Sequence, residues 1–205
     1  MIKVEKMDVF NFDGAIRGMR NPLNSWDKSD SSIGDVIYVG ENDLSLMRRL
    51  YQAGSEHRKY LRQIMVCMDI TAPRLWWTEF DTYKVGVTAD SCSTMHTIHK
   101  KPFDYDDFSC DHYNNDSMLL LGEIIEKLNL EREIFLKTKN VKAWEQMIYL
   151  LPQSYNQKRT VTMNYENVMN MINQRSNHKL SEWRQFVNIL KDLPYIEAIR
   201  QDNHD

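Results

Sequence analysis

The chain has 205 residues, a formal net charge of −3 and 42% hydrophobic residues. This length predicts a single domain over residues 1–205 with enough apolar side chains for a hydrophobic core. The slightly acidic balance argues against a nucleic-acid partner, because such proteins usually carry a basic surface. No apolar run reaches the roughly 20 residues that span a bilayer, so no membrane partner is expected either.

Cysteine and glycine usage narrows the class of protein further. The three cysteines are Cys67, Cys92 and Cys110, and they show no CxxC spacing. An odd number of scattered cysteines without a secretory signal segment is typical of a reducing compartment, so we expect a cytoplasmic protein. The seven glycines form no phosphate-binding loop, which argues against P-loop NTPases and standard Rossmann enzymes.

The first half of the chain alternates between strand and helix patterns. Period-two alternation of apolar side chains marks the strands, while apolar residues on one face mark the helices. Trp26 lies in a turn-rich segment, and a tryptophan there predicts a structured loop instead of a linker. In chain order we expect a strand at 2–10, a structured loop at 21–30, a helix at 41–54, a strand at 64–70 and a helix that begins at Pro73 and continues to residue 80.

The second half is mainly helical, apart from one stretch without a clear period. Residues 85–112 mix β-branched, histidine and acidic positions and predict no regular element. Beyond them we expect two helices between residues 117 and 150 with a break near 138–140, a strand at 158–163, a helix at 164–175 and a final helix from about residue 180.

The segment 164–175, NYENVMNMINQR, carries the most informative pattern in the sequence. A largely apolar helix that repeats asparagines and ends in Arg175 is unusual as pure scaffold. Carboxamides and a guanidinium are groups that bind a flat polar or anionic ligand. The segment therefore predicts a ligand-binding surface.

This segment, followed by Trp183, resembles the C-terminal signature of flavin-dependent thymidylate synthases, the ThyX family. Leu151-Pro152 lies where that family has a Leu-Pro before its last strand, and the order of elements is similar over nearly the whole chain. The resemblance implies an α/β (α+β) ThyX-like fold with a mixed sheet and long helices. It also implies a homotetramer with shared active sites, and the apolar residues 119–121, 124 and 125 fit either an interface or a core.

The resemblance also implies roles for particular residues. FAD would be the cofactor and a pyrimidine nucleotide the substrate. The cofactor-binding residues implied are Asn164, Asn170, Ser55 and His57. The substrate-binding residues implied are Arg175, Ser93, Lys84, Arg58 and Trp26.

The family's defining motif, Arg-His-Arg-x-x-Ser-x-Asn-Glu-x-Ser-x-Arg-Tyr, is missing from residues 80–96. Tyr83-Lys84-Val85 replaces the Arg-His-Arg triplet, Met95 replaces the terminal arginine, and Ile148 replaces an arginine just before Leu-Pro. Charge-assisted contacts to a phosphate contribute ~1.5–3 kcal/mol each. Their loss lowers nucleotide affinity by orders of magnitude, so methylation of dUMP by the family's route is not expected, and the degraded motif weakens the case for FAD.

Two classes of function follow. The first is a ThyX-like nucleotide-binding protein whose pocket serves nucleotide metabolism without the original reaction. The second is an active flavin-dependent thymidylate synthase or a related enzyme that modifies pyrimidine nucleotides. Nearby cations either rebuild a phosphate site or form an ordinary solvated face; they are Arg17, Arg20, Arg58, Lys59, Arg62 and Lys84.

Other residue groups have simpler interpretations. Trp76 and Trp77 are expected to lie in the core. Cys92 and His96 are close enough in sequence for a nucleophile pair, but no orienting partner is visible. Several potential zinc ligands gather in one stretch without any established spacing, so we expect no metal; they are Cys92, His96, His99, Cys110 and His112.

Overall fold

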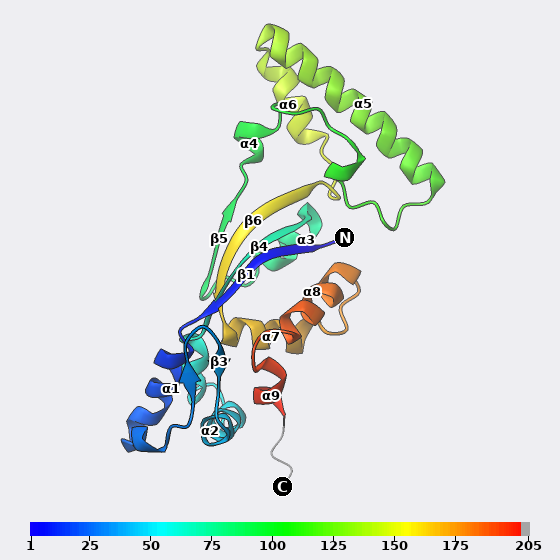
Figure 1. The fold of residues 1–205 in the computed structure, drawn as a ribbon. Coiled ribbons are helices and arrows are strands. Elements are labelled where there is room, and N and C mark those ends of the chain that lie inside the picture. Colours follow the sequence, from blue (N-terminus) through cyan, green and yellow to red (C-terminus); the bar gives the residue numbers. More distant parts are fainter. Residues whose placement is uncertain (202–205) are drawn as a thin grey trace. The chain divides into compact units, whose positions relative to one another are not determined.

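The structure is a computed structural model that describes residues 1–201. The strands are β1 (Lys3–Phe10), β2 (Ser32–Ile33), β3 (Ile37–Tyr38), β4 (Met65–Pro73), β5 (Val87–Ser91) and β6 (Asn156–Asn164). The α-helices are α1 (Phe12–Arg20), α2 (Glu41–Gln52), α3 (Arg74–Phe80), α4 (Thr94–Thr97), α5 (Asn115–Thr138), α6 (Val141–Tyr149), α7 (Tyr165–Arg175), α8 (Ser181–Lys191) and α9 (Ile196–Arg200) (Figure 1). Short 3-10 helices are η1 (Asn21–Leu23), η2 (Trp26–Lys28), η3 (Arg58–Arg62) and η4 (Tyr105–Asp107).

Four strands form one sheet in the order β1-β4-β6-β5, and β2 pairs with β3 in a separate antiparallel ribbon. The chain divides into two compact units whose boundary falls within all four strands of the larger sheet. Unit 1 comprises residues 1–4, 69–82 and 90–160. Unit 2 comprises residues 5–68, 83–89 and 161–205. No helix among residues 1–201 combines the length and apolar composition needed to cross a bilayer.

Unit 1 contains the helical hairpin of α5 and α6, which lie side by side (Figure 1). Lys139 ends α5 in the left-handed conformation at φ 57°, and the side chain of Asn140 then caps α6. A residue in the left-handed conformation ends one helix, and an asparagine cap, which suits a helix start, begins the next. The predicted break near 138–140 is therefore confirmed. Apolar residues from both helices and the preceding loop form a core: Ile98, Phe103, Phe108, Leu121, Ile125, Leu128, Met147 and Leu151.

Unit 2 is organised around α7 and α8, which pack against each other. Tyr165, at the start of α7, is fully buried, packs edge-on against Phe12 at 5.6 Å, and donates to the carbonyl of Pro194 at 2.9 Å. Helix α9 packs on α2, where Arg48 donates to the Ala198 carbonyl at 2.9 Å. Side chains from distant segments thus hold the C-terminal helices in this unit.

The loop between α1 and α2 is fixed by a buried ion pair. Arg20 Nε lies 2.6 Å from Asp43 Oδ1, and both side chains are almost fully buried. The other carboxylate oxygen of Asp43 accepts from the hydroxyls of Ser29 and Ser31 at 2.7 and 2.6 Å and from the amide of Asp30 at 3.1 Å. A buried carboxylate is stable only when paired and hydrogen-bonded, and this network explains why the segment 21–30 is structured, as predicted.

Several element boundaries differ from those that the sequence predicts. Pro73 ends β4 and precedes α3, which begins at Arg74. Asn164 is the last residue of β6 and caps α7 instead of lying within it. The stretch 85–112 contains β5 and α4, which hydrophobic periodicity did not reveal because most of their side chains are exposed. Helix α9 was also missed, since five residues are too few to show a period.

Candidate functional site

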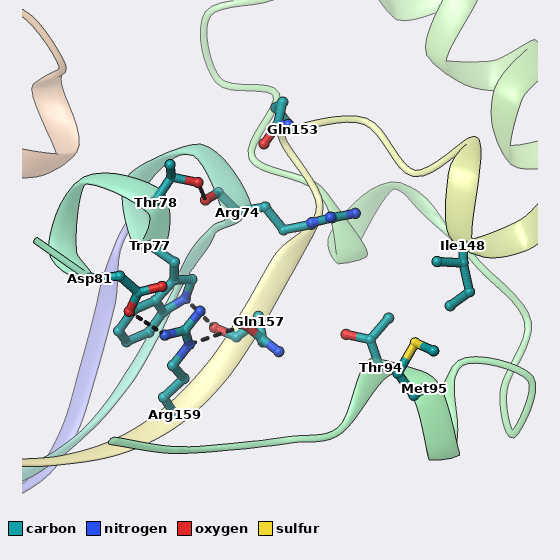
Figure 2. Close-up of a pocket in the computed structure, with 10 residues that line it drawn as sticks. All are labelled: Arg74, Trp77, Thr78, Asp81, Thr94, Met95, Ile148, Gln153, Gln157 and Arg159. Carbon is teal, nitrogen blue, oxygen red and sulfur yellow. Dashed lines mark hydrogen bonds and ion pairs between the residues drawn. The ribbon is translucent and has the colours of Figure 1, made fainter. Parts of the chain in front are cut away.

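A pocket of about 310 Å³ opens in unit 1, and we call it the Arg74 pocket (Figure 2). Helix α3, the start of α4, the end of α6 and strand β6 with the loop before it supply its walls. The lining residues are Arg74, Trp77, Thr78, Asp81, Thr94, Met95, Ile148, Gln153, Gln157 and Arg159. The volume is at the lower end of the range, ~300–1,000 Å³, that small-molecule sites occupy.

Arg159 is held in a fixed orientation at one side of this pocket. Its Nη1 lies 2.7 Å from Asp81 Oδ1, and its Nε donates to Gln157 Oε1 at 3.1 Å. The guanidinium also stacks 4.2 Å from the ring centroid of Trp77, whose indole is buried. Cation–π contact, ion pair and hydrogen bond together place one immobile positive group beside one carboxylate.

Arg74 contrasts with Arg159. Its side chain is half-buried, and its guanidinium makes no hydrogen bond or ion pair with any other described residue. Its backbone amide is already used, donating to the Tyr155 carbonyl at 2.9 Å. Figure 2 shows the guanidinium extending from α3 into the pocket, away from Asp81. The pocket therefore holds a cation without a protein counterion.

Met95 and Ile148 line the same pocket. These are the two positions at which the resemblance to ThyX places arginines, so the apolar surface predicted there is now located beside Arg74. Sequence reasoning missed Arg74 and Arg159 because no local motif marks them. They come together only when the start of α3 docks on the loop before β6.

A second pocket, of about 410 Å³, lies in unit 2 and includes His57, one of the predicted cofactor residues. We call it the His57 pocket. Its lining residues are Gly18, Met19, Asn21, Pro22, Leu50, Glu56, His57, Lys59, Tyr60 and Gln63. The side chains of His57 and Lys59 make no hydrogen bond or ion pair with other described residues, so both remain available to a ligand.

Ser55 and Arg58 lie next to His57 in sequence but not in the lining of its pocket. The Ser55 carbonyl accepts from Arg62 Nη2 at 2.8 Å. Arg58 donates through Nε to the Tyr51 carbonyl at 2.6 Å and stacks 4.3 Å from the Tyr51 ring centroid. Internal contacts thus occupy Arg58, and the structure does not bring Ser55 and Arg58 into this pocket.

Arg175 lies in an aromatic cluster of unit 2. Its Nε donates to the Tyr83 hydroxyl at 2.9 Å, and its guanidinium is 4.8 Å from the Trp183 ring centroid. The Tyr83 hydroxyl in turn donates to Gln174 Oε1 at 2.9 Å. The half-buried guanidinium is therefore held in place by stacking. Arg175 does not line either of the two pockets described above.

Asn164 takes part in a reciprocal capping box at the start of α7. Its side chain accepts from the Asn167 amide at 3.0 Å, while Asn167 Oδ1 accepts from the Asn164 amide at 3.2 Å. Asn167 Nδ2 also donates to the Val85 carbonyl at 2.8 Å. At Gly86, φ is +75° and an added Cβ would lie 2.7 Å from Asn164 Nδ2, so only glycine lets this loop approach the cap.

The remaining predicted site residues are dispersed. The hydroxyl of Ser93 caps α4 by accepting from the His96 amide at 3.3 Å. The exposed Lys84 side chain makes no hydrogen bond or ion pair with other described residues. Trp26 is half-exposed and donates to Asn21 Oδ1 at 2.9 Å. Asn170 is half-buried, and its carboxamide makes no hydrogen bond with another described residue.

Among residues 1–201, no three histidine, cysteine, aspartate or glutamate side chains converge as a metal site would require. The five potential zinc ligands noted in the sequence therefore do not assemble. Trp76 and Trp77 are both buried in the core, as predicted, and their rings lie 4.9 Å apart.

Comparison with known proteins gives matches in structure alone. No family model and no curated protein matches the sequence. The chain is similar to ThyX from Helicobacter pylori in complex with FAD and dUMP, at a TM-score of 0.71 and 19% identity over 98% of this chain and 97% of that one. A second structure of the same enzyme with FAD and dUMP gives a TM-score of 0.71 and 20% identity over 97% of both chains. The structure of a UMP/dUMP methylase, PolB, from Streptomyces cacaoi bound with 5-Br dUMP gives a TM-score of 0.65 and 14% identity over 97% of this chain and 94% of that one.

The chain has the ThyX fold. The α/β (α+β) architecture predicted from the sequence is thereby confirmed over nearly the whole length. Identities this low establish a shared fold and carry no activity with them. The ThyX fold accounts for the order of strands and helices. The Arg74 pocket within it also includes Arg74 and Arg159, which the resemblance did not single out.

Some of the described polar side chains in unit 2 suit a flavin nucleotide such as FAD, and others are already engaged. His57, Lys59 and Asn170 have unused polar groups suited to the edge and phosphates of a flavin nucleotide, whereas the Asn164 side-chain oxygen is already used by the α7 cap. Bound FAD would supply redox chemistry, and the protein would supply binding and orientation. Of the cofactor-binding residues that the resemblance implies, His57 and Asn170 thus have side chains that no other described residue engages.

Proposed function

We propose that this protein binds a nucleotide and that classical methylation of dUMP is lost or altered in it. The observation that carries the proposal is the ThyX fold over nearly the whole chain, shared with structures that contain dUMP, FAD or 5-Br dUMP. We extend that likeness to individual residues and propose that Arg175, Lys84 and Ser93 bind the nucleotide. A role in nucleotide metabolism follows from the ligand class.

The altered chemistry is inferred from the residues that replace the arginines of the ThyX motif. Met95 and Ile148 contribute apolar surface to the Arg74 pocket, and apolar groups cannot donate to a phosphate. Tyr83, at the first arginine position of the Arg-His-Arg triplet, is hydrogen-bonded to Arg175 and Gln174. The ligand is therefore held by a different set of contacts from those of the motif.

The alternative is an active flavin-dependent enzyme, a thymidylate synthase or a related enzyme acting on pyrimidine nucleotides. The FAD-bound neighbours and the unused side chains of His57 and Asn170 favour it. In this alternative, Asn164, Asn170, Ser55 and His57 contact the flavin, and Arg58 and Trp26 border the substrate.

A ligand panel is expected to separate the two functions. Purified protein is tested by thermal shift against dUMP, UMP, FAD, FMN and signalling nucleotides. A ligand at a hundred times its Kd stabilises the folded state by about 2.7 kcal/mol, so a cognate nucleotide raises the Tm clearly. Protein that absorbs near ~450 nm, as its flavin would, indicates the enzyme. Colourless protein stabilised by a nucleotide but not by FAD indicates the binder.

Arg175→Ala tests the predicted nucleotide contact in the same assay. We expect the variant to lose the response to nucleotides, because a stacked guanidinium is a pre-oriented partner for an anionic or carbonyl group. The control is Arg49→Ala, which removes an exposed arginine from α2 in the same unit. An unchanged nucleotide response would place the binding site elsewhere, and no response of wild-type protein to any nucleotide or flavin would refute the proposed function.

We also propose that the chain forms a homotetramer in the cytoplasm, as the resemblance implies. Helix α5 carries Leu119, Leu120 and Leu130 with 71%, 57% and 54% of their surfaces exposed in the single chain. Exposed leucines on one helix are typical of an interface. The double variant Leu119→Glu/Leu120→Glu is expected to lower the mass measured by light scattering. Val36→Glu, at a 77% exposed residue of unit 2, is the control, and an unchanged mass for the double variant would exclude this face of α5.

A further inference from the structure

The Arg74 pocket has an excess of positive charge that the protein itself does not neutralise. Its charged lining residues are Arg74, Arg159 and Asp81. Asp81 pairs with Arg159 at 2.7 Å, so these two charges offset each other and the charge of Arg74 remains. Arg74 is not exposed to bulk solvent like a surface arginine, because the residue is partly buried.

A half-buried guanidinium without a counterion is unfavourable, because burial removes water that would otherwise solvate it. Asp81 is the one acidic residue in the lining of the pocket, and it pairs with Arg159, so no lining residue serves as a counterion to Arg74. The Gln153 carboxamide and the Thr94 hydroxyl line the pocket and make no side-chain hydrogen bond with other described residues. A guanidinium, an amide and a hydroxyl that face one space are the donors that bind a tetrahedral oxyanion.

Arg159 adds a second donor set whose position is fixed. One Nη contacts Asp81, and Nε contacts Gln157, while Trp77 supports the guanidinium from one face. This side chain therefore does not lose further conformational freedom when it binds a ligand. About half of the Asp81 side chain is exposed, and its negative charge repels a bound anion. Removing this charge should raise the affinity for an anion, whereas removing the charge of Arg74 should lower it.

We propose that the Arg74 pocket binds a phosphate monoester, with Arg74 as the anchor and Arg159 as the pre-positioned second cation. These two arginines take the place of the arginines that the ThyX resemblance assigns to positions 95 and 148. The volume of about 310 Å³ accommodates a phosphate and the adjoining part of a mononucleotide. The identity of the ester as a nucleoside monophosphate rests on the proposed function, whereas the binding of phosphate does not.

The test measures binding of inorganic phosphate, dUMP and deoxyuridine by calorimetry at low salt. Arg74→Gln is expected to weaken phosphate and dUMP binding by about ten- to a hundredfold, the range for one lost charge-assisted contact, without affecting deoxyuridine. Asp81→Asn is expected to strengthen phosphate binding, because it removes the opposing charge. Lys137→Gln, which removes an exposed cation in the same unit, is the control and leaves all three unchanged.

Each outcome decides between the inference and the proposed function. Wild-type protein that binds dUMP, with no change in Arg74→Gln and Asp81→Asn, overturns the Arg74 site and leaves nucleotide binding intact. Phosphate binding that depends on Arg74, without preference for any nucleotide, supports the site and refutes the nucleotide function. Wild-type protein that binds neither phosphate nor dUMP overturns the inference. If circular dichroism shows that Arg74→Gln does not fold, Asp81→Asn decides the question. Tighter phosphate binding by Asp81→Asn supports the site, and unchanged binding overturns it.

Discussion

Asp43→Ala is expected to lower the free energy of unfolding by about 3–5 kcal/mol, the range for breaking a buried ion pair from one side. The cost arises because Arg20, with only 5% of its side chain exposed, keeps its charge without a partner. The hydroxyls of Ser29 and Ser31 and the amide of Asp30 lose their acceptor at the same time. We expect the loop between α1 and α2 to become disordered first, since this network is what fixes it.

Urea denaturation followed by circular dichroism measures this change. Asp13→Ala is the matched control, because Asp13 makes an exposed ion pair with Arg17 at 3.4 Å. Exposed pairs contribute ~0–1 kcal/mol, so the control should hardly shift the urea midpoint. Equal midpoints for the two variants would show that the Asp43 network does not stabilise the fold.

The same residue predicts how stability depends on pH. Burial raises the pKa of Asp43, but hydrogen bonds from Ser31, Ser29 and Arg20 outweigh burial and hold the pKa below its ordinary value of 3.8. A carboxyl whose pKa is lower in the folded state stabilises the protein above its ordinary pKa. That contribution is lost as the pH falls through the folded pKa. The stability difference between wild type and Asp43→Ala should therefore be full at neutral pH and shrink in acid below 3.8.

The sequence predicted the elements better than it predicted the geometry of the site. The strand at 2–10, the helix stop at Gly54 and the break near 138–140 depend on alternation and on capping residues, which are local properties. The exposed strand β5 and the short helices α4 and α9 lack such signals, and they were not found. Their placement depends on contacts between distant segments, such as the Cys92 amide with the Lys158 carbonyl at 2.9 Å.

The difference between local signals and contacts of distant segments also explains which site residues the sequence could reveal. Arg175 stood out because it ends an unusual helix, yet its contacts with Tyr83 and Trp183 could not be inferred from that helix alone. Arg74 and Arg159 carry no motif and look like ordinary surface cations in the sequence. Their significance lies in a difference of environment: Asp81 pairs with Arg159, and no described residue pairs with Arg74. Such a difference is visible only when the pocket has formed.

Met95→Arg is expected to raise the affinity for dUMP and inorganic phosphate by about tenfold or more. The side chain lines the Arg74 pocket, and about half of its surface is exposed. A new guanidinium can therefore reach the pocket without being buried, at little cost to stability. One added charge-assisted contact contributes ~1.5–3 kcal/mol, which corresponds to about ten- to a hundredfold in Kd. This prediction rests on the proposed phosphate site.

Met95→Gln is the matched control, because it adds a polar side chain of similar length without a charge, and calorimetry at two salt concentrations measures both variants. The gain in Met95→Arg should fall at higher salt, since added ions screen a partly exposed contact. Combining Met95→Arg with Arg74→Gln separates two explanations. If Arg74 anchors the phosphate, the double variant loses most of the gain, because neighbouring contacts to one anion are coupled. If the new arginine raises affinity equally in both backgrounds, the anion binds at Met95 alone and Arg74 is not its anchor.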